Sequence, residues 1–258
     1  MGGLYALVSA GGSPGVTTAT VALALSWPAP VIVAECDPSG GDILAGLLSG
    51  HVPCGHGLME YAIEAGRSGG TAPPSLCTQL IPLDDDQTRM VLPGLTDPRQ
   101  AAGLASAWPA VAAAMAAQPA DVIADCGRLD AGPGQPLAVL SAAGAVGIVL
   151  RPTLRQVWSA RPRVEMLGEL LGDTARLTLL LTGPGTRSVR EVAHALALPV
   201  AAVLPADSRT ASLLSDGFGG QRQLGSGPLM RSARAAGRAL RDHATVMSEQ
   251  SPDGGVVR

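Results

Sequence analysis

A glycine-rich turn followed by two threonines is the stretch of this sequence best suited to hold an anion. It runs from Gly11 to Thr18 (GGSPGVTT) and lies between an apolar run at residues 4–8 and a segment rich in alanine, leucine and valine. A strand, a glycine turn and a helix start, in this order, gather backbone N–H groups and the positive end of the helix dipole around one point. We therefore predict a phosphate-binding loop, or P-loop, with the hydroxyl of Thr17 placed to reach a magnesium ion.

The lysine of the usual P-loop is missing. In the pattern G-x-x-x-x-G-K-[ST], the two glycine positions hold Ala10 and Gly15, and the lysine position holds Val16. The chain has no lysine at all, so all 18 of its basic residues are arginines. Pro14 also removes one backbone N–H from the loop. We expect the loop to bind phosphate more weakly than a complete one.

Two acidic strand ends could complete a magnesium site. The apolar run 31–34 leads into Glu35-Cys36-Asp37-Pro38, and the run 121–124 leads into Asp125. Ligands of parallel α/β sheets bind at the carboxyl ends of the strands. Asp125 is therefore a candidate for the Walker B carboxylate, which holds the water shell of the metal opposite the loop threonine. Asp37 is a second candidate ligand.

Arginine could replace part of the missing charge. Arg128 and Arg151 both lie beside predicted strand ends. A charge-assisted contact to phosphate contributes about 1.5–3 kcal/mol, and arginine can supply one from a different direction than a loop lysine. Nucleotide binding is thus predicted to survive, whereas efficient hydrolysis is not.

The order of apolar runs predicts an α/β fold. A doubly wound, mostly parallel sheet of about seven strands, with helices on both faces, accounts for their alternation with helical segments. One of these helical segments is the alanine-rich stretch 101–117. The strands are expected at residues 4–8, 31–34, 89–92, 121–125, 145–150, 177–181 and 200–204.

Length and composition favour one domain. The chain has 258 residues, of which 47% are hydrophobic and only 2% aromatic, so its core must be aliphatic. We assign residues 1–247 to a single domain and 248–258 to a disordered tail. A net charge of −3 without a basic run gives no indication of a nucleic-acid surface. Without a signal-like segment or an apolar run of ~18 residues, we expect a cytoplasmic protein.

The segment 229–246 is predicted to be a basic amphipathic helix. Four arginines follow one another at helical spacing, and a basic amphipathic helix can lie on an anionic membrane. Its apolar face is small and lacks Trp and Phe, which favours docking against the sheet instead. Peripheral membrane contact through this helix is the less favoured alternative. The four arginines are Arg231, Arg234, Arg238 and Arg241.

Over about residues 4–215 these landmarks resemble the MinD/ParA family of deviant-Walker ATPases, which have a P-loop NTPase fold of the SIMIBI type. The family loop K-G-G-x-G-K-T-T corresponds to residues 11–18, the element D-x-D-P to residues 35–38, and the Walker B aspartate to Asp125. Both family lysines are replaced, by Gly11 and by Val16. The loop also resembles the G-S-P-G-V-T-T loop of a group of actinobacterial MinD-like proteins associated with pilus or secretion operons.

The resemblance implies a homodimer gated by ATP and Mg²⁺ that works with a protein partner as a spatial regulator or assembly factor. It implies that Asp37 activates the attacking water, and that Thr17, Asp37 and Asp125 serve the metal. It further implies that Thr182, Pro205 and Asp207 border the adenine. The loop residues that would surround the phosphates are Gly11, Gly12, Ser13, Pro14, Gly15, Val16, Thr17 and Thr18.

Three other hypotheses are alternatives to that of a weak ATPase. A pseudo-ATPase scaffold would keep the fold and lose the nucleotide, and the sequence leaves this alternative open. An amidotransferase-linked or dethiobiotin-type ligase is disfavoured because phosphoryl transfer would require the loop lysine. A Rossmann dehydrogenase is disfavoured because the glycines do not follow the spacing G-x-G-x-x-G.

Overall fold

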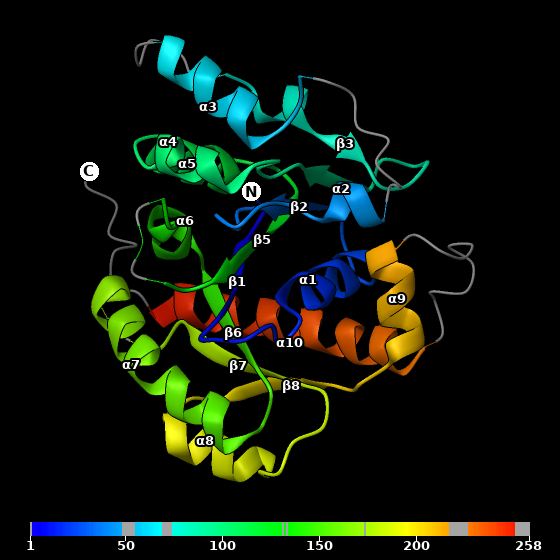
Figure 1. The fold of residues 1–258 in the computed structure, drawn as a ribbon, viewed down its shortest axis with the longest axis vertical. Coiled ribbons are helices and arrows are strands. Elements are labelled where there is room, and N and C mark those ends of the chain that lie inside the picture. Colours follow the sequence, from blue (N-terminus) through cyan, green and yellow to red (C-terminus); the bar gives the residue numbers. More distant parts are fainter. Residues whose placement is uncertain are drawn as a thin grey trace.

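Eight strands form one sheet at the centre of the molecule (Figure 1). The computed structural model describes residues 2–47, 55–68, 74–130, 132, 134–172, 174–216 and 227–250. Within them, the strand order is β3-β4-β2-β5-β1-β6-β7-β8. The strands are β1 Leu4–Ser9, β2 Val31–Glu35, β3 Ile81–Pro82, β4 Arg89–Leu92, β5 Asp121–Arg128, β6 Ala145–Leu150, β7 Leu177–Thr182 and β8 Val200–Leu204.

The expected doubly wound, mostly parallel sheet is confirmed. All seven predicted strands are present and pair in parallel. The eighth strand, β3, is antiparallel to β4 and was not predicted. It consists only of Ile81 and Pro82, which is too short to show a periodic pattern in the sequence.

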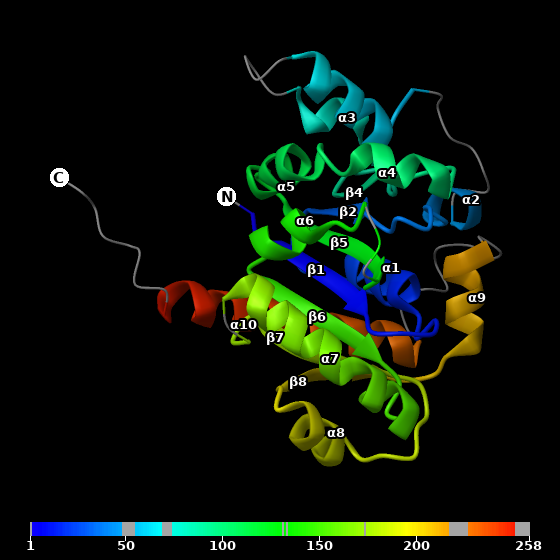
Figure 2. The same cartoon turned by 60° about the vertical axis from the view of Figure 1, so that its left-hand side comes forward.

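Helices cover both faces of the sheet (Figures 1 and 2). Each face of the sheet has its own core cluster, and the side chains of β1 alternate between the two. Tyr5 and Leu7 belong to one cluster, and Ala6 and Val8 belong to the other. The first cluster contains residues of α1 Val16–Leu25, α2 Ile43–Gly46, α9 Ser208–Asp216 and α10 Pro228–Gln250. The second contains residues of α3 Leu58–Arg67, α4 Ala101–Leu104, α5 Trp108–Ala116, α6 Leu137–Ala142, α7 Leu154–Leu171 and α8 Val189–Leu196.

The predicted helix 101–117 is in fact two helices. α4 ends at Leu104 and α5 begins at Trp108. Pro109 lies in the first turn of α5, where its missing N–H costs no hydrogen bond. The proline therefore stands at the beginning of the second helix.

The C-terminal helix docks against the sheet, as the small apolar face predicted. Leu229, Met230 and Leu240 of α10 are buried in the cluster that contains α1. Arg241 pairs with Asp121 of β5 at 3.3 Å.

α10 extends to Gln250, so the expectation of a tail from residue 248 was wrong for its first three residues. Residues 251–258 lie outside the described part of the chain. No helix of the described residues has the length and apolar character to cross a membrane.

Candidate nucleotide-binding site

The loop between β1 and α1 has a backbone suited to an anion. Gly12, Ser13 and Gly15 all have positive φ angles, of 47°, 26° and 92°. Such left-handed positions turn successive N–H groups towards a common concavity. Gly15 precedes the first turn of α1, whose N–H groups have no side-chain cap. The loop predicted from the sequence therefore presents backbone donors at its centre.

Two side chains from distant elements hold this loop in place. Thr182, at the end of β7, donates its hydroxyl hydrogen to the carbonyl of Pro14 at 2.8 Å. Gln156, in the first turn of α7, donates from Nε2 to the carbonyl of Gly12 at 3.2 Å. Its Oε1 accepts from the backbone N–H of Arg151 at 2.7 Å. The loop is thus tied to the strand ends of β6 and β7.

Gln156 is a site residue that the sequence analysis missed. It stands three residues after Thr153, the N-cap of α7, in the pattern T-x-x-Q that is typical of a capping box. The pattern predicts that the glutamine side chain bonds to the backbone of the cap residue. Instead it bonds to Arg151 and to the loop. This signal could have revealed the helix start, but not the contact with the loop.

Asp125 is buried beside the loop and already contacts Thr17. Its side chain accepts a hydrogen bond from the Thr17 hydroxyl and one from the N–H of Gly127 at 2.9 Å. Burial raises the pKa of Asp125 to about 7, these hydrogen bonds oppose the rise, and the negative charges of Asp37 and Glu35 add to it. The carboxylate is therefore held in a place where a cation would stabilise its charged form.

Asp37 lies close to Asp125 because a glycine makes room for it. Glu35 of β2 and Asp125 of β5 are register partners, so the segment after β2 passes directly beside the end of β5. Gly127 has a φ of 60°, and a Cβ atom there would overlap the carboxylate of Asp37. Asp37 accepts from the N–H of Ser39 at 2.8 Å. The structure thus brings both predicted carboxylates and Thr17 together.

Glu35 has a positioning role that the sequence did not indicate. It is 3% exposed and accepts from the N–H of Ile43 at 2.8 Å and of Gly94 at 3.1 Å. Burial raises its pKa, although these backbone hydrogen bonds favour the charged form. The side chain fastens the segment that carries Asp37 to the end of β4.

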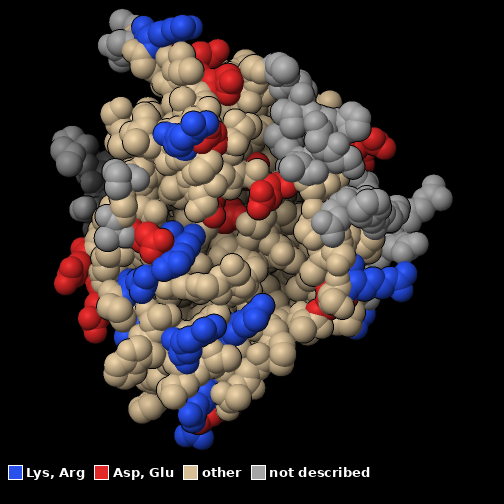
Figure 3. Space-filling view, viewed as in Figure 1, with Lys and Arg blue, Asp and Glu red and all other residues tan. Residues whose placement is uncertain are grey.

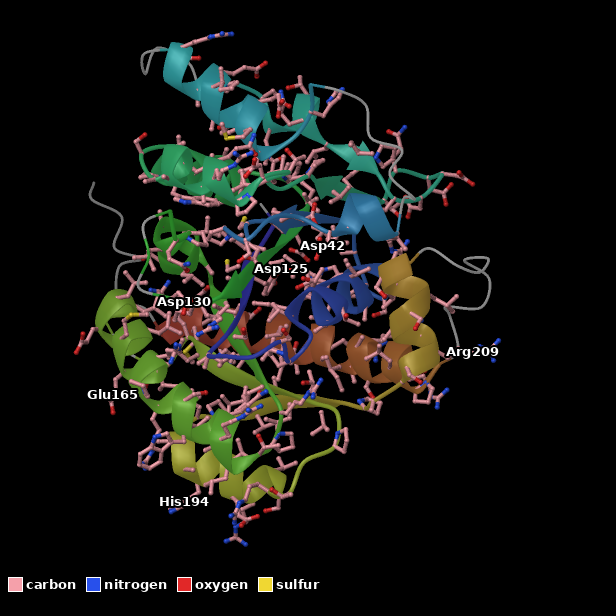
Figure 4. The ribbon with its side chains drawn as sticks, viewed as in Figure 1. Asp42, Asp125, Asp130, Glu165, His194 and Arg209 are labelled. Carbon is pink, nitrogen blue, oxygen red and sulfur yellow. The ribbon has the colours of Figure 1, made fainter. Side chains whose placement is uncertain are left out.

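Two adjoining hollows open at this end of the sheet, on the face seen in Figure 3. The phosphate-side hollow, of about 460 Å³, includes Thr17, Asp37 and Arg128 in its wall. The base-side hollow, of about 340 Å³, includes Thr182, Pro205 and Asp207. Both hollows share Pro14, Gly15 and Thr18 of the loop. Figure 4 labels Asp125 near the centre of the sheet and Asp42 at the start of α2.

Most of the predicted site residues line one of these hollows. Asp125 lines neither, because it is 2% exposed and reaches the phosphate-side hollow only through its hydrogen bond with Thr17. Three further residues need separate comment. Gly11 is in neither wall and lies against Ser159 of α7. Val16 borders the phosphate-side hollow, but it is 7% exposed and belongs to the core cluster of α1. Asp207 lines the base-side hollow, but its carboxylate accepts from the N–H and the hydroxyl of Thr210, which lowers its pKa.

The two candidate arginines lie on different sides of the loop. Arg128 lines the phosphate-side hollow and Arg151 lines the base-side hollow. In the part of the chain that the structure describes, no group of three or more His, Cys, Asp and Glu side chains forms a metal centre. Thr17, Asp37 and Asp125 are the predicted oxygen-bearing side chains that the structure brings together beside the loop.

Comparison with known proteins supports the fold and its class. No protein-family model matches the chain, and no curated protein matches it. Among solved structures, it is similar to a ParA family ATPase from Chlorobium tepidum TLS, with 16% identity, 91% of this chain and 98% of that chain covered, and a TM-score of 0.70. It is also similar to the septum site-determining protein MinD of Pyrococcus horikoshii OT3 in complex with Mg-ADP (16% identity, 96% and 99% covered, TM-score 0.70). A third similar structure is a McdA variant from Cyanothece in complex with ATP (18% identity, 93% and 98% covered, TM-score 0.61). The chain therefore has the α/β fold of the MinD and ParA P-loop ATPases.

Proposed function

We propose that this protein binds ATP with Mg²⁺ across the two hollows and acts as a nucleotide-dependent spatial regulator or assembly factor with slow hydrolysis. One observation carries the proposal. The anion-binding loop, Thr17 and Asp37 line one hollow, Asp125 is buried next to it in a hydrogen bond with Thr17, and that hollow adjoins a second, largely apolar one. A phosphate chain with its metal requires the first environment, and a base requires the second.

The residues present fit a magnesium ion. Mg²⁺ prefers oxygen ligands and keeps several waters, so one hydroxyl and one or two carboxylates suffice when phosphate oxygens complete the shell. Thr17 and Asp125 are already hydrogen-bonded to each other, and both Thr17 and Asp37 line the phosphate-side hollow. Once bound, the ion would neutralise charge on the phosphates. The unusually high pKa of Asp125 supports this assignment, because that carboxylate has burial and negative neighbours to overcome.

The base would be held by shape more than by a carboxylate. The base-side hollow has Leu204, Pro205 and Ala211 in its wall, together with Thr182 and Asp207. Thr182 donates to the loop, and Asp207 is engaged with Thr210. Their polar groups are therefore committed within the protein, which favours stacking of adenine against apolar side chains.

Hydrolysis is proposed to be slow. Asp37 is partly exposed in the phosphate-side hollow, where it could orient a water molecule. The loop lysine that would stabilise charge on the phosphates is Val16, which packs in the core. Loss of one such contact costs about 1.5–3 kcal/mol. The replacement of this lysine also favours a second candidate function, a pseudo-ATPase scaffold that no longer binds nucleotide.

The cellular role is proposed from the fold. Proteins of the MinD and ParA fold with bound ADP or ATP are among the similar structures. By this resemblance, we propose a homodimer that forms in the presence of ATP and engages a protein partner of positioning, pilus or secretion machinery. No direct role for nucleic acid is proposed. The protein would be cytoplasmic, with peripheral membrane contact through α10 less favoured because its apolar face is buried.

Light scattering with and without Mg·ATP tests this role. We expect the mass of the wild-type protein to rise towards that of a dimer with Mg·ATP and not with Mg²⁺ alone. Thr17→Ala should remain unchanged by nucleotide, whereas Thr17→Ser keeps the hydroxyl and should behave as wild type. Phosphate release measured on the same samples gives the hydrolysis rate. A wild-type protein whose mass and turnover ignore ATP would favour the scaffold instead.

A further inference from the structure

The phosphate-side hollow has a single positive side chain in its wall. Among the described residues that line it, Arg128 is the only cation, and it stands opposite two acids, Asp37 and Asp42. The chain has no lysine, and Arg151 lines the base-side hollow instead. A triphosphate brings several negative charges into a place that already holds carboxylates. The position of Arg128 therefore bears directly on whether the site can hold it.

A bulge in β5 directs Arg128 into this hollow. Leu7 of β1 is the register partner of Asp125, but Ser9 is the partner of Arg128, so β5 contains one extra residue between them. Cys126 and Leu129 are three residues apart, and both belong to the core cluster that contains α5. Regular alternation would have placed Arg128 on the side of Cys126. Because the bulge shifts the alternation, Arg128 faces the loop instead.

The guanidinium group of Arg128 is held by a partner that can be exchanged. Its Nε lies 3.2 Å from Oδ1 of Asp130, in a pair whose side chains are about half exposed. Oδ1 of Asp130 is also 3.7 Å from Nη2 of Arg163. Nε of the same arginine donates to the carbonyl of Leu129 at 3.0 Å. Exposed ion pairs are weak, so a phosphate can compete for the guanidinium. Asp130 would keep Arg163 as its partner after the exchange.

We propose that Arg128 is the phosphate-binding cation of this site, in place of the missing loop lysine, and that it exchanges Asp130 for the phosphate chain of the nucleotide. The inference rests on the proposed nucleotide binding and names the residue that makes it feasible without lysine. Arginine suits this task because its planar group can contact two phosphate oxygens at once.

Calorimetric titration of Arg128→Gln tests the inference. The probes are Mg·ATP and Mg·tripolyphosphate, which has the phosphate chain without the base. We expect Arg128→Gln to weaken both by tenfold or more, because one charge-assisted contact is lost. Arg128→Lys should recover part of the affinity. Arg190→Gln is the matched control, since it removes an exposed arginine of α8 that lines neither hollow, and it should leave the binding of both probes unchanged.

A double-mutant cycle with Asp130 tests the exchange itself. Asp130→Asn releases the guanidinium, so it should raise the affinity for Mg·ATP severalfold when Arg128 is present. In the Arg128→Gln background it should have no effect, because the side chain through which it acts is gone. An equal rise in both backgrounds would show a general charge effect and would overturn the exchange.

The possible failures can be told apart. Thermal melting should be nearly unchanged in Arg128→Gln, because the side chain is exposed, and a loss of affinity then reports binding and not unfolding. If Arg128→Gln binds both probes like wild type, the inference is overturned while nucleotide binding stands. If the wild-type protein binds neither probe, both the inference and the proposed function fail.

Discussion

At the scale of single residues, the site depends on how closely three carboxylates are placed. Asp125 accepts from Thr17 and Gly127, and Asp37 fits beside it only because residue 127 has no side chain. Glu35 is the register partner of Asp125 on the neighbouring strand, and its carboxylate is held by backbone N–H groups. The negative charges of Asp37 and Glu35 disfavour ionisation of Asp125. A bound cation would offset this repulsion between the carboxylates and favour the charged form of Asp125.

The first prediction concerns the pH dependence of stability at Asp125. Its pKa is raised to about 7 in the folded protein, from 3.8 in a free aspartate. As the pH rises from about 4 to about 7, the unfolded chain releases this proton before the folded chain does, so the free energy of unfolding falls. Asp125→Asn removes this loss. It should be more stable than wild type at pH 8, by at most about 4 kcal/mol, and the advantage should shrink towards pH 4.

Denaturant unfolding at several pH values measures this difference. Asp207→Asn is a control of opposite sign, because the hydrogen bonds with Thr210 lower the pKa of Asp207. That substitution should destabilise the protein near pH 7 and lose its effect as the pH falls through the acidic range. A wild-type advantage over Asp125→Asn that grows from pH 5 to pH 8 would contradict the assignment.

The second prediction concerns Gly127. Gly127→Ala introduces a side chain at a φ of 60° and forces Asp37 to move. Gly172→Ala is the matched control, since Gly172 has a φ of 80° but nothing near its Cβ position. The control should lose only the backbone cost, about 1–2 kcal/mol. Gly127→Ala should lose more stability and also its Mg²⁺-dependent nucleotide binding. Nucleotide affinity equal to that of Gly172→Ala would show that Asp37 does not need this position.

At the scale of elements, the loop is held from the β7 side as well as by its own chain. Thr182 lies at the carboxyl end of β7 and donates to Pro14. Thr178 lies at the other end of the same strand and donates to the carbonyl of Pro199 at 3.0 Å. Both threonines are buried. One strand therefore offers two threonine hydrogen bonds to backbone carbonyls, only one of which reaches the site.

The third prediction uses this pair. Thr182→Val should lower the free energy of unfolding by about 1–3 kcal/mol, because it removes the side-chain donor of the Pro14 carbonyl. Thr178→Val should cost less, about 0.5–1.5 kcal/mol, because the carbonyl of Pro199 keeps the backbone N–H of Leu179 at 2.8 Å. Only Thr182→Val should weaken Mg·ATP binding, since only it frees the loop. Paired chemical denaturation and calorimetric titration separate the two effects. Equal losses of affinity in both variants would mean that the tether has no specific role.

The sequence predicted elements better than it predicted contacts between them. The seven parallel strands follow from apolar runs of four to eight residues, and the acids at their ends follow from topology. The shift of alternation at Arg128 depends on pairing with β1, and the reach of Gln156 depends on where α7 begins. These are relations between segments more than a hundred residues apart. Local pattern and propensity contain no information about them.

At the scale of the whole molecule, the site lies at the carboxyl end of β1, where the strand order of the sheet reverses. β1 is central, with β5 and β2 on one side and β6, β7 and β8 on the other. The phosphate-side hollow uses the ends of β2 and β5, whereas the base-side hollow uses the ends of β7 and β8. A nucleotide bound at this switch point would contact both halves of the sheet. Binding should therefore stabilise the fold as a unit.

The most direct test of the central claim is calorimetric titration of the wild-type protein with Mg·ATP and Mg·ADP, beside Thr17→Ala and Thr17→Ser. We predict micromolar binding by wild type and Thr17→Ser, and its loss in Thr17→Ala, because the hydroxyl joins the loop to Asp125 and, in the proposed complex, would reach the metal. That result would mean that a loop without lysine still holds the nucleotide. No binding by the wild-type protein up to millimolar nucleotide would contradict the claim and identify the protein as a scaffold.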